Sequence, residues 1–295
     1  MPILLNGHSQ DMILGCYYLT LEKKGQKGEG RTFSSFNEVL LAYENKEISL
    51  HAMVKAKFKG NFMNLSTYYD DQAILTCPLT EVENGPIETT PGRIIFNSIL
   101  PKEIPYINGK MKKKGLESLV YFTYLGVSLE PTIKMLDQMK EFGFYYATLA
   151  GFSLGIDDFI IPKEKSELVQ KAQKEVQKIE NFYQEGVISS RERFNRVIEI
   201  WGGVTDKVSS AMIEEMRRVS FEGDALNPLF VMADSGSRGN KQQIRQLAGM
   251  RGLMSKPSGE IIETPIISNL REGLNVLQYF ISTHGARKGL ADTAL

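Results

Sequence analysis

The residues best suited to chemistry lie in one short segment, Asp234-Ser235-Gly236-Ser237-Arg238-Gly239. Its glycines leave backbone amides open, its hydroxyls can donate hydrogen bonds, and Arg238 offers a fork of donors that matches phosphate oxygens. This combination suits a triphosphate. A turn rich in serine and glycine with one arginine is also typical of a loop that caps a helix, and on these residues alone we favour the capping loop.

A second segment, Met250 to Gly259, combines basic groups with flexible apolar side chains. Arg251 and Lys256 supply the charges, and Met254 is an adaptable methionine. The composition fits a plain surface connection and equally a mobile loop over a ligand. Both interpretations stay open.

A third group of residues places two cations among small residues that permit close approach of a ligand backbone. It consists of Thr283, His284, Gly285, Ala286, Arg287, Lys288 and Gly289. A phosphodiester backbone is the natural candidate ligand. We expect His284 to be a structural histidine rather than a catalytic base, because no partner carboxylate can be placed from the sequence.

The element that must position this third group is a long helix. Ser268 is a plausible N-cap, and we expect the helix to run from there toward Leu295. One apolar face carries Leu270, Leu274, Leu277, Phe280 and Ile281. Glycines at 273, 285 and 289 each cost roughly 1 kcal/mol within a helix, so the far half is expected to bend.

A helical hairpin is predicted upstream of these segments. After Pro162, apolar residues recur at helical spacing as far as Tyr183, and Gly186 interrupts the pattern. Ser189 or Ser190 can cap a second helix, which continues through Trp201. The hairpin either packs only on itself or presents its polar tip, residues 184–193, to a partner. On the residues alone we favour self-packing.

The first half of the chain is expected to mix helices and strands. Expected helices are Phe36 to Tyr43, Leu116 to Leu125, and Thr132 to Phe142 ending before Gly143; expected strands lie within Leu50 to Tyr69 and at Phe144 to Leu149. Turn residues Asn84-Gly85-Pro86 and Pro91-Gly92 are expected to separate elements.

Composition sets the broad class. The chain has 295 residues, 42% of them hydrophobic, which is enough for sizeable cores, and its 35 bases balance 35 acids. Cys16 and Cys77 lack CxxC spacing, so two reduced thiols are expected. No run of about 18 apolar residues occurs. A soluble protein of a reducing compartment is the default. From Arg238 onward eight bases face four acids, so this end is locally basic.

Several stretches closely resemble the beta-prime subunit of bacterial DNA-dependent RNA polymerase. They are Asp234 through Gly239, Gln243-Ile244-Arg245-Gln246-Leu247-Ala248-Gly249-Met250-Arg251-Gly252, and Asn275 through Leu295. Ser9-Gln10-Asp11, Leu14-Gly15 and Gly155-Ile156-Asp157-Asp158 resemble the same family in the same order. The resemblance therefore covers nearly the whole chain.

The resemblance implies an α+β fold, mainly helical in the C-terminal two thirds. Residues 1–150 would form a pore-like mixed α/β region, and residues 151–220 a funnel with the rim helices of the secondary channel, Lys163 to Arg217. Residues 221–295 would carry the F-loop, Leu253 to Thr264, and most of the bridge helix, Ser268 to Leu295.

The resemblance also implies roles for single residues. Arg238 would contact the phosphates of the incoming nucleotide, which agrees with its fork of donors and reverses our preference for a plain capping loop. Arg251, Met254 and Lys256 would belong to the F-loop. The bridge-helix positions near template DNA would be Thr283, His284, Gly285, Ala286, Arg287, Lys288 and Gly289. The residues that dock secondary-channel factors would be Gln184, Glu185, Gly186 and Arg191, which favours a partner arm over a self-packed hairpin.

The implied activity is DNA-directed RNA polymerase, a nucleotidyltransferase, acting in a multisubunit complex. Expected partners are the beta, alpha, omega and sigma subunits, the DNA template and RNA–DNA hybrid, nucleoside triphosphates and transcript-cleavage factors, with no membrane and a location in the bacterial cytoplasm. The family's Mg²⁺ motif, Asn-Ala-Asp-Phe-Asp-Gly-Asp, is not in this sequence. The trigger loop is also expected to lie beyond Leu295. The metal ligands are thus expected outside this chain, no catalytic set is complete, and the isolated chain is expected to be inactive.

Two other classes of protein are alternatives. One is a stand-alone interaction module, with a docking hairpin and a helix that binds nucleic acid. The other, a P-loop hydrolase, lacks the glycine-rich loop that ends in Gly-Lys-Ser/Thr. A piece of a larger subunit is expected to expose the apolar face of Leu274, Leu277 and Phe280 and to aggregate, whereas a module evolved to stand alone is expected to be monodisperse.

Overall fold

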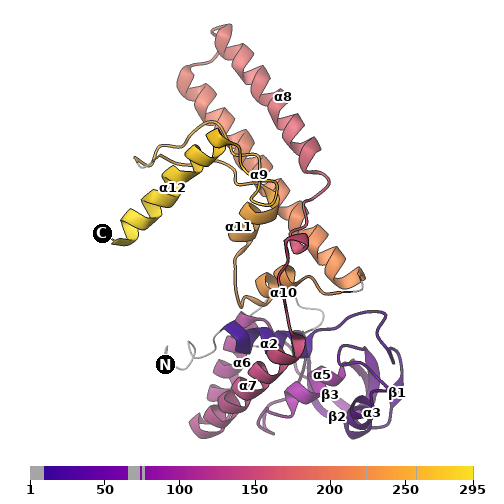
Figure 1. Cartoon of the computed structure of the whole chain (residues 1–295). Coiled ribbons are helices and arrows are strands. Elements are labelled where there is room, and N and C mark those ends of the chain that lie inside the picture. Colours follow the sequence, from indigo (N-terminus) through magenta and orange to yellow (C-terminus); the bar gives the residue numbers. More distant parts are fainter. Residues whose placement is uncertain (1–9, 66–73, 75–76, 224, 257, 295) are drawn as a thin grey trace. The chain divides into compact units, whose positions relative to one another are not determined.

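The computed structural model describes the chain except residues 1–9, 66–73, 75–76, 224, 257 and 295, and the side chains of 286–288 and 290–292 (Figure 1). The chain divides into two compact units. Unit 1 comprises Met1–Ser153 with Val231–Arg238, and unit 2 comprises Leu154–Phe230 with Gly239–Leu295. Helices predominate and the sheet is small, so the predicted α+β class is confirmed.

The helices and strands of the two units follow in chain order. Unit 1 contains α2 (Gln10–Thr20), β1 (Thr32–Phe33), α3 (Phe36–Glu44), β2 (Val54–Asn64), β3 (Thr80–Thr89), α5 (Pro91–Asn97), β4 (Tyr106–Asn108), α6 (Lys113–Gly126) and α7 (Leu129–Ala150). Unit 2 contains η2 (Ile156–Asp158), α8 (Lys165–Gln184), α9 (Ser190–Glu222), α11 (Lys241–Ile244), η3 (Arg245–Gly249) and α12 (Val276–Ala294). The remaining helix, α10 (Pro228–Ser235), contributes residues to both units.

The sheet of unit 1 is built around β2. This strand pairs in parallel with β1 and β4 and antiparallel with β3, with a bulge between Phe58 and Gly60. The strand predicted within residues 50–69 is therefore confirmed as β2. The turn predicted at Asn84-Gly85-Pro86 is wrong, because these residues lie inside β3, where Pro86 faces Lys57. β3 is an edge strand of this sheet. An edge strand tolerates proline where the backbone nitrogen faces away from the neighbouring strand, because no inter-strand hydrogen bond is lost there.

The helix α3 forms where it was predicted and covers part of the sheet. Ser35 caps it, because its hydroxyl accepts a hydrogen bond from the backbone N–H of Glu38. The Phe36 ring stacks on Phe58 with centroids 5.3 Å apart, and Tyr106 packs against both rings. These aromatic contacts join α3, β2 and β4 into one hydrophobic cluster.

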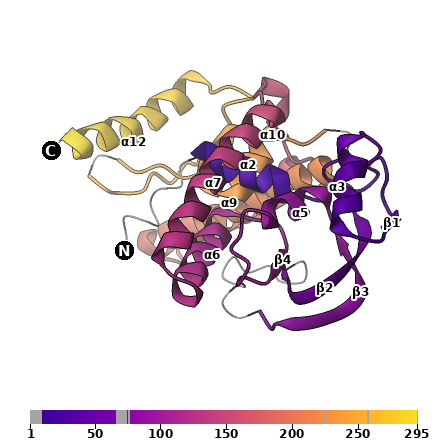
Figure 2. The same ribbon diagram turned by 90° about the horizontal axis from the view of Figure 1, so that it is seen from below.

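Two glycines allow α2 and α7 to pack in direct backbone contact (Figure 2). A Cβ at Gly15 would lie 1.8 Å from the carbonyl oxygen of Gly143, and one at Gly143 would lie 2.6 Å from the Cα of Met12. The prediction of a helix that ends before Gly143 and a strand at 144–149 is wrong. Gly143 lets the backbone of α2 approach α7 closely and does not end the helix, which continues to Ala150.

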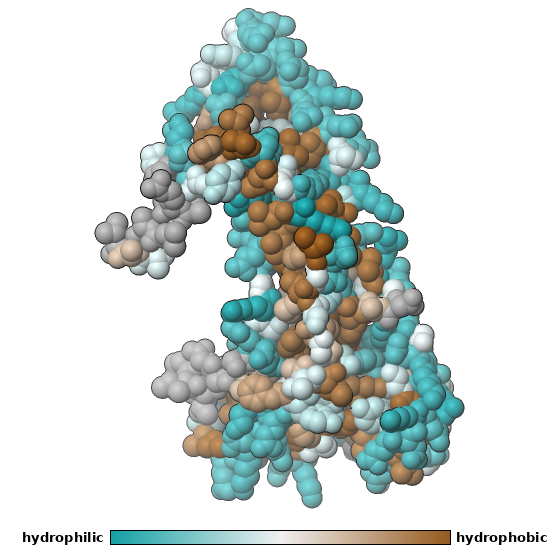
Figure 3. All heavy atoms as spheres, viewed as in Figure 1, coloured by the Kyte–Doolittle hydropathy of each residue, from teal (hydrophilic) through white to brown (hydrophobic). Residues whose placement is uncertain are grey.

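The helical hairpin of unit 2 is confirmed. Ser189 caps α9 by accepting a hydrogen bond from the N–H of Glu192, and the seam between α8 and α9 buries Ala172, Trp201 and Val208. Hydrophilic side chains cover the outer side of α8 and the tip of the hairpin (Figure 3). The two helices therefore pack by the apolar stripes that the sequence showed.

The last helix begins later than the sequence predicted. The side chain and backbone of Asn269 exchange hydrogen bonds with those of Glu272, which closes a turn, and Gly273 follows with φ +86°. A helix cannot pass through this left-handed conformation. Asn275 and Gln278 then form a reciprocal cap, and α12 starts at Val276 rather than Ser268.

The two cysteines, Cys16 and Cys77, are buried free thiols. Burial raises the pKa of Cys16 to about 12. Among the helices that the structure describes, none is long and apolar enough to cross a membrane.

The contact between α2 and α7 yields the first prediction. Gly143→Ala should destabilise the chain by about 1–3 kcal/mol, because the new methyl group meets the backbone of α2. Gly126→Ala is the control, since a Cβ there has no atom within 4 Å, and it should change stability by about 1 kcal/mol or less. Urea unfolding followed by circular dichroism measures both. Equal stabilities of the two variants would contradict the close contact.

Candidate functional site

Arg238 lies on a turn that follows directly from α10. The hydroxyls of Ser235 and Ser237 both donate to the carbonyl of Met232, at 3.0 and 3.2 Å, and the N–H of Arg238 donates to the same carbonyl at 3.3 Å. Gly236 has φ +75°, which ends the helix. The serines thus serve the turn and not a ligand. The Arg238 side chain is exposed and has no hydrogen bond or ion pair with any residue in the described part of the chain.

Asp234, four residues before Arg238, is held by three side chains of unit 1. It accepts a hydrogen bond from the Tyr17 hydroxyl at 2.6 Å and pairs with the Nζ atoms of Lys110, at 3.1 Å, and Lys112, at 2.9 Å. The side chain of Asp234 is 21% exposed, so these contacts are partly shielded from water. We call these four residues the Asp234 clamp.

The charges of the clamp are reflected in its pKa values. Burial alone would raise the pKa of Asp234, but the two lysines and the tyrosine hydroxyl outweigh it and lower the pKa to about 2. Burial raises the pKa of Tyr17 well above its ordinary value, and the charge of Asp234 adds to this. Tyr17 is therefore the donor in its hydrogen bond with an ionised Asp234.

The sequence reasoning missed the clamp. Lys110 to Lys114 holds four lysines in five residues, which was a visible signal of a basic surface. Gly236 packs directly on this run, because a Cβ there would lie 3.1 Å from the Cβ of Lys113. Nothing local indicated that Asp234 meets residues more than 120 positions away.

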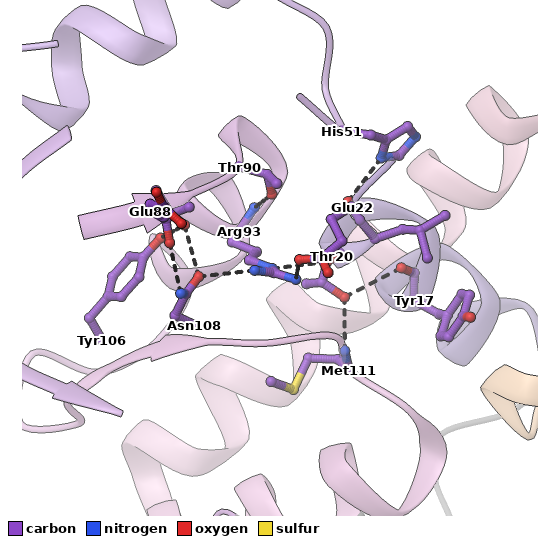
Figure 4. Close-up of polar contacts among 12 residues, drawn as sticks. Tyr17, Thr20, Glu22, His51, Glu88, Thr90, Arg93, Tyr106, Asn108 and Met111 are labelled. Carbon is purple, nitrogen blue, oxygen red and sulfur yellow. Dashed lines mark hydrogen bonds and ion pairs between the residues drawn. The ribbon is translucent and has the colours of Figure 1, made fainter. Parts of the chain in front are cut away.

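A buried arginine network in unit 1 involves Thr20, on the same helix as Tyr17 of the clamp (Figure 4). Arg93 is 2% exposed and donates to the carbonyl of Thr20 at 3.1 Å, to Oδ1 of Asn108 at 3.2 Å and to Glu22 at 2.7 Å. The hydroxyl of Thr20 accepts from the N–H of Met111 at 2.9 Å. These bonds tie the end of α2 to the segment 106–112. They therefore fix the two elements that supply the partners of Asp234.

The predicted docking residues lie at the exposed tip of the hairpin in unit 2. Gln184 ends α8, Glu185 and Gly186 form the turn, and Arg191 lies in the first turn of α9. All four are exposed. Val187 beside them is 68% exposed, so the tip also carries an apolar group that the sequence reading described only as polar.

The predicted F-loop residues lie on a narrow loop of unit 2. Bridges between Gly252 and Ile266 and between Ser255 and Ile261 pair its two sides. Lys256 is exposed and pairs with Glu260 at 2.7 Å. Arg251 is half-buried, which lowers the pKa of its guanidinium, and its Nε has no hydrogen-bond partner among the described residues.

The predicted bridge-helix residues lie on α12, and the structure brings this helix to the F-loop. The sulfur of Met254 lies 3.9 Å from the position that a Cβ of Gly285 would take. Thr283 donates to the carbonyl of Phe280, while His284 and Gly289 are exposed. Ala286, Arg287 and Lys288 belong to α12, but their side chains lie outside the described residues.

The candidate residues therefore fall on both units. Arg238 and its clamp belong to unit 1, whereas the hairpin tip, the F-loop and α12 belong to unit 2. Within the described ranges, no group of three or more His, Cys, Asp or Glu side chains could hold a metal ion. The described residues offer an exposed guanidinium at Arg238 and exposed side chains at the hairpin tip and on α12.

Two family models match the chain. RNA polymerase Rpb1, domain 3, matches residues 4–159, and RNA polymerase Rpb1, domain 4, matches residues 188–271. Together they cover most of both units.

Curated relatives give the same result. The chain is 52% identical over 290 residues to the DNA-directed RNA polymerase subunit beta' of Koribacter versatilis, and 48% identical over 295 residues to that of Aquifex aeolicus. It is also 48% identical over 287 residues to that of Pelotomaculum thermopropionicum. Each alignment covers 97% of this chain but only 21%, 17% and 22% of the respective relative. The chain thus spans about a fifth of the length of these relatives.

The Asp234 clamp yields a prediction about stability and pH. The folded pKa of Asp234 is about 2, below its ordinary 3.8, so its ion pairs stabilise the fold fully above about pH 4 and lose that effect as the pH falls toward 2. Asp234→Asn should therefore lower the free energy of unfolding by about 2 kcal/mol at pH 7, and by much less near pH 2.5. Urea titrations at both pH values measure this.

The control for this prediction is Asp137→Asn on α7. The side chain of Asp137 is 67% exposed and pairs only with Lys140 among the described residues. Its replacement should change stability by about 0.5 kcal/mol or less at either pH. A constant deficit of Asp234→Asn from pH 7 to pH 2.5 would contradict the ionic role of Asp234.

Proposed function

Because this chain belongs to the RNA polymerase Rpb1 and beta' family, we propose that it acts as part of the catalytic subunit of DNA-directed RNA polymerase. The reaction is DNA-templated RNA synthesis from nucleoside triphosphates. This chain contributes the nucleotide-phosphate contact, the wall of the secondary channel and the bridge helix. It works assembled with the beta, alpha, omega and sigma subunits in the bacterial cytoplasm.

The observation that carries this proposal is the state of Arg238. Its backbone is fixed by the turn, while its guanidinium is exposed and unpaired within the described residues. A guanidinium binds phosphate oxygens through two parallel hydrogen bonds, and a fixed backbone lowers the entropy lost on binding. In the polymerase, Arg238 therefore holds the triphosphate of the incoming nucleotide.

Phosphoryl transfer in this family requires Mg²⁺, which supplies charge stabilisation when it is bound. The described residues do not fit such a site, because they include no group of carboxylates that could ligate it. We place the ligands outside this chain. Its own residues bind and orient the nucleotide.

The exposed apolar face of α12 fits an element that is covered in a larger assembly. Val276, Leu277 and Phe280 are 71%, 74% and 62% exposed. Burial of such side chains gives roughly 1.5–3 kcal/mol each, so a partner surface is favoured there. In our proposal, other polymerase subunits and the template strand with its RNA–DNA hybrid cover α12 and the neighbouring F-loop.

The hairpin of unit 2 is proposed as the docking arm for transcript-cleavage factors that enter the secondary channel. The apolar side chains between α8 and α9 are buried against each other. The tip exposes one acidic residue, Glu185, one basic residue, Arg191, and the apolar Val187. Charged groups at the rim of an interface set association rate and specificity. Glu185 and Arg191 are suited to this role.

The contact of Arg238 with the triphosphate is tested in the assembled polymerase that contains this chain. Arg238→Ala should raise the KM for nucleoside triphosphates about tenfold, because a charged hydrogen bond is worth about 1.5–3 kcal/mol. Arg238→Lys keeps the charge but loses the fork, so it should recover only part of the affinity. Lys140→Ala, an exposed cation on α7, is the control. An unchanged KM for Arg238→Ala would overturn the proposed contact.

The docking role of the hairpin tip is tested by reversing its charges. Glu185→Arg combined with Arg191→Glu should raise the Kd of a transcript-cleavage factor about tenfold, because the pattern of charge at the rim is inverted. The measurement is factor-stimulated RNA cleavage against factor concentration, normalised to the rate of each enzyme without factor. Lys174→Glu, exposed in the middle of α8, should leave the Kd unchanged. Equal factor affinity of the tip variant and this control would contradict docking at the tip.

A further inference from the structure

The turn that carries Arg238 behaves as one body with the end of α10. Six hydrogen bonds within residues 232–238 link it, among them the bond from the N–H of Gly236 to the carbonyl of Ala233 at 3.2 Å and that from the N–H of Ser237 to the hydroxyl of Ser235 at 3.2 Å. None of these bonds joins the turn to another element. The place of Arg238 in unit 1 must therefore be set by contacts at the edge of this body.

Asp234 supplies three of these contacts, and Gly236 packs on Lys113. It is the residue of the body that reaches across to α2, through Tyr17 at 2.6 Å, and to the segment before α6, through Lys110 and Lys112 at 3.1 and 2.9 Å. Charge-assisted hydrogen bonds to a carboxylate are shorter and stronger than neutral ones, and three of them from two directions define an orientation.

The partners of Asp234 are themselves well fixed. Tyr17 is fully buried, and the Nζ atom of Lys110 lies 5.4 Å from the centroid of its ring, so the ring and the hydroxyl of Tyr17 both contact members of the clamp. Thr20, one turn after Tyr17, binds Met111 between the two lysines. The clamp is thus anchored on the Arg93 network described above.

We propose that Asp234 is a positioning residue for nucleotide binding: its clamp on Tyr17, Lys110 and Lys112 sets the point from which Arg238 reaches the triphosphate. This inference rests on the proposed function of Arg238. Asp234 does not touch the substrate and acts through Arg238. Its pKa of about 2 means that it stays charged throughout the working range of pH.

The experiment uses steady-state nucleotide incorporation by the assembled polymerase, with variants of this chain. Asp234→Asn removes the charge but keeps the shape, and Tyr17→Phe removes one hydrogen bond while it keeps the ring against Lys110. Each should raise the KM for nucleoside triphosphates, by about fivefold and about twofold respectively, with kcat nearly unchanged. Asp137→Asn on the exposed face of α7 is the matched control.

The decisive readout is a double-mutant cycle. In the background of Arg238→Ala, Asp234→Asn and Tyr17→Phe should raise the KM no further, because the residue they position is gone. A loss of folding would instead lower kcat and persist in that background. Normal assembly of each variant subunit is verified by the amount of purified polymerase.

Each other outcome overturns a specific claim. If Arg238→Ala alone leaves the KM unchanged, the proposed contact and the inference built on it both fail. If Arg238→Ala raises the KM but both clamp variants leave it unchanged, only the positioning role of Asp234 fails. If the clamp variants raise the KM equally with and without Arg238, Asp234 acts independently of Arg238, and the inference is again wrong.

Discussion

Burial of the Arg93 guanidinium is the constraint on which unit 1 depends. A charge removed from water costs several kcal/mol unless hydrogen bonds and an opposite charge replace its hydration. Arg93 meets this requirement with the carbonyl of Thr20, the side chain of Asn108 and the carboxylate of Glu22. Thr20 ends α2, Glu22 lies directly after it, and Asn108 ends β4. The guanidinium is therefore satisfied only when the end of α2 and β4 stand in one arrangement.

The same arrangement carries the candidate phosphate contact. Thr20 binds Arg93 through its carbonyl and Met111 through its hydroxyl, so α2 and the segment 106–112 are held at a fixed separation. Tyr17 projects from the first and Lys110 from the second, and both reach Asp234. The order of dependence runs from a buried charge, to two elements of the fold, to a partly buried ion cluster, and finally to an exposed arginine.

The sequence predicted the elements whose stability is local and failed where tertiary contacts decide. Periodicity and the Ser189 cap were sufficient for α8 and α9, because apolar stripes and caps act within one helix and its neighbour. Gly143 was predicted to end a helix, yet it permits the close contact of α7 with α2. Pro86 was predicted to lie in a turn, yet it lies in the edge strand β3. The late start of α12 follows from Gly273 and the Asn269 turn, which periodicity does not register. In the candidate site, Arg238 was predicted through the resemblance, since its chemistry alone favoured a capping loop. Its clamp joins positions separated by 122 to 217 residues, which no local pattern encodes.

The two kinds of candidate site are built according to the size of their proposed ligands. A triphosphate offers few atoms, so an arginine that binds it must already be in place, and a misplacement of about 1 Å costs much of the effect. The Arg93 network and the Asp234 clamp give unit 1 a fixed arrangement of this kind. A protein or nucleic-acid partner brings an interface of its own, on the order of 800 Å² per side, and can order flexible groups as it binds. The hairpin tip and the apolar face of α12 accordingly expose their side chains and lack a comparable network in the described residues. Under the proposed roles, preorganisation is concentrated where the ligand is small, and exposed surface is kept where the partner is large.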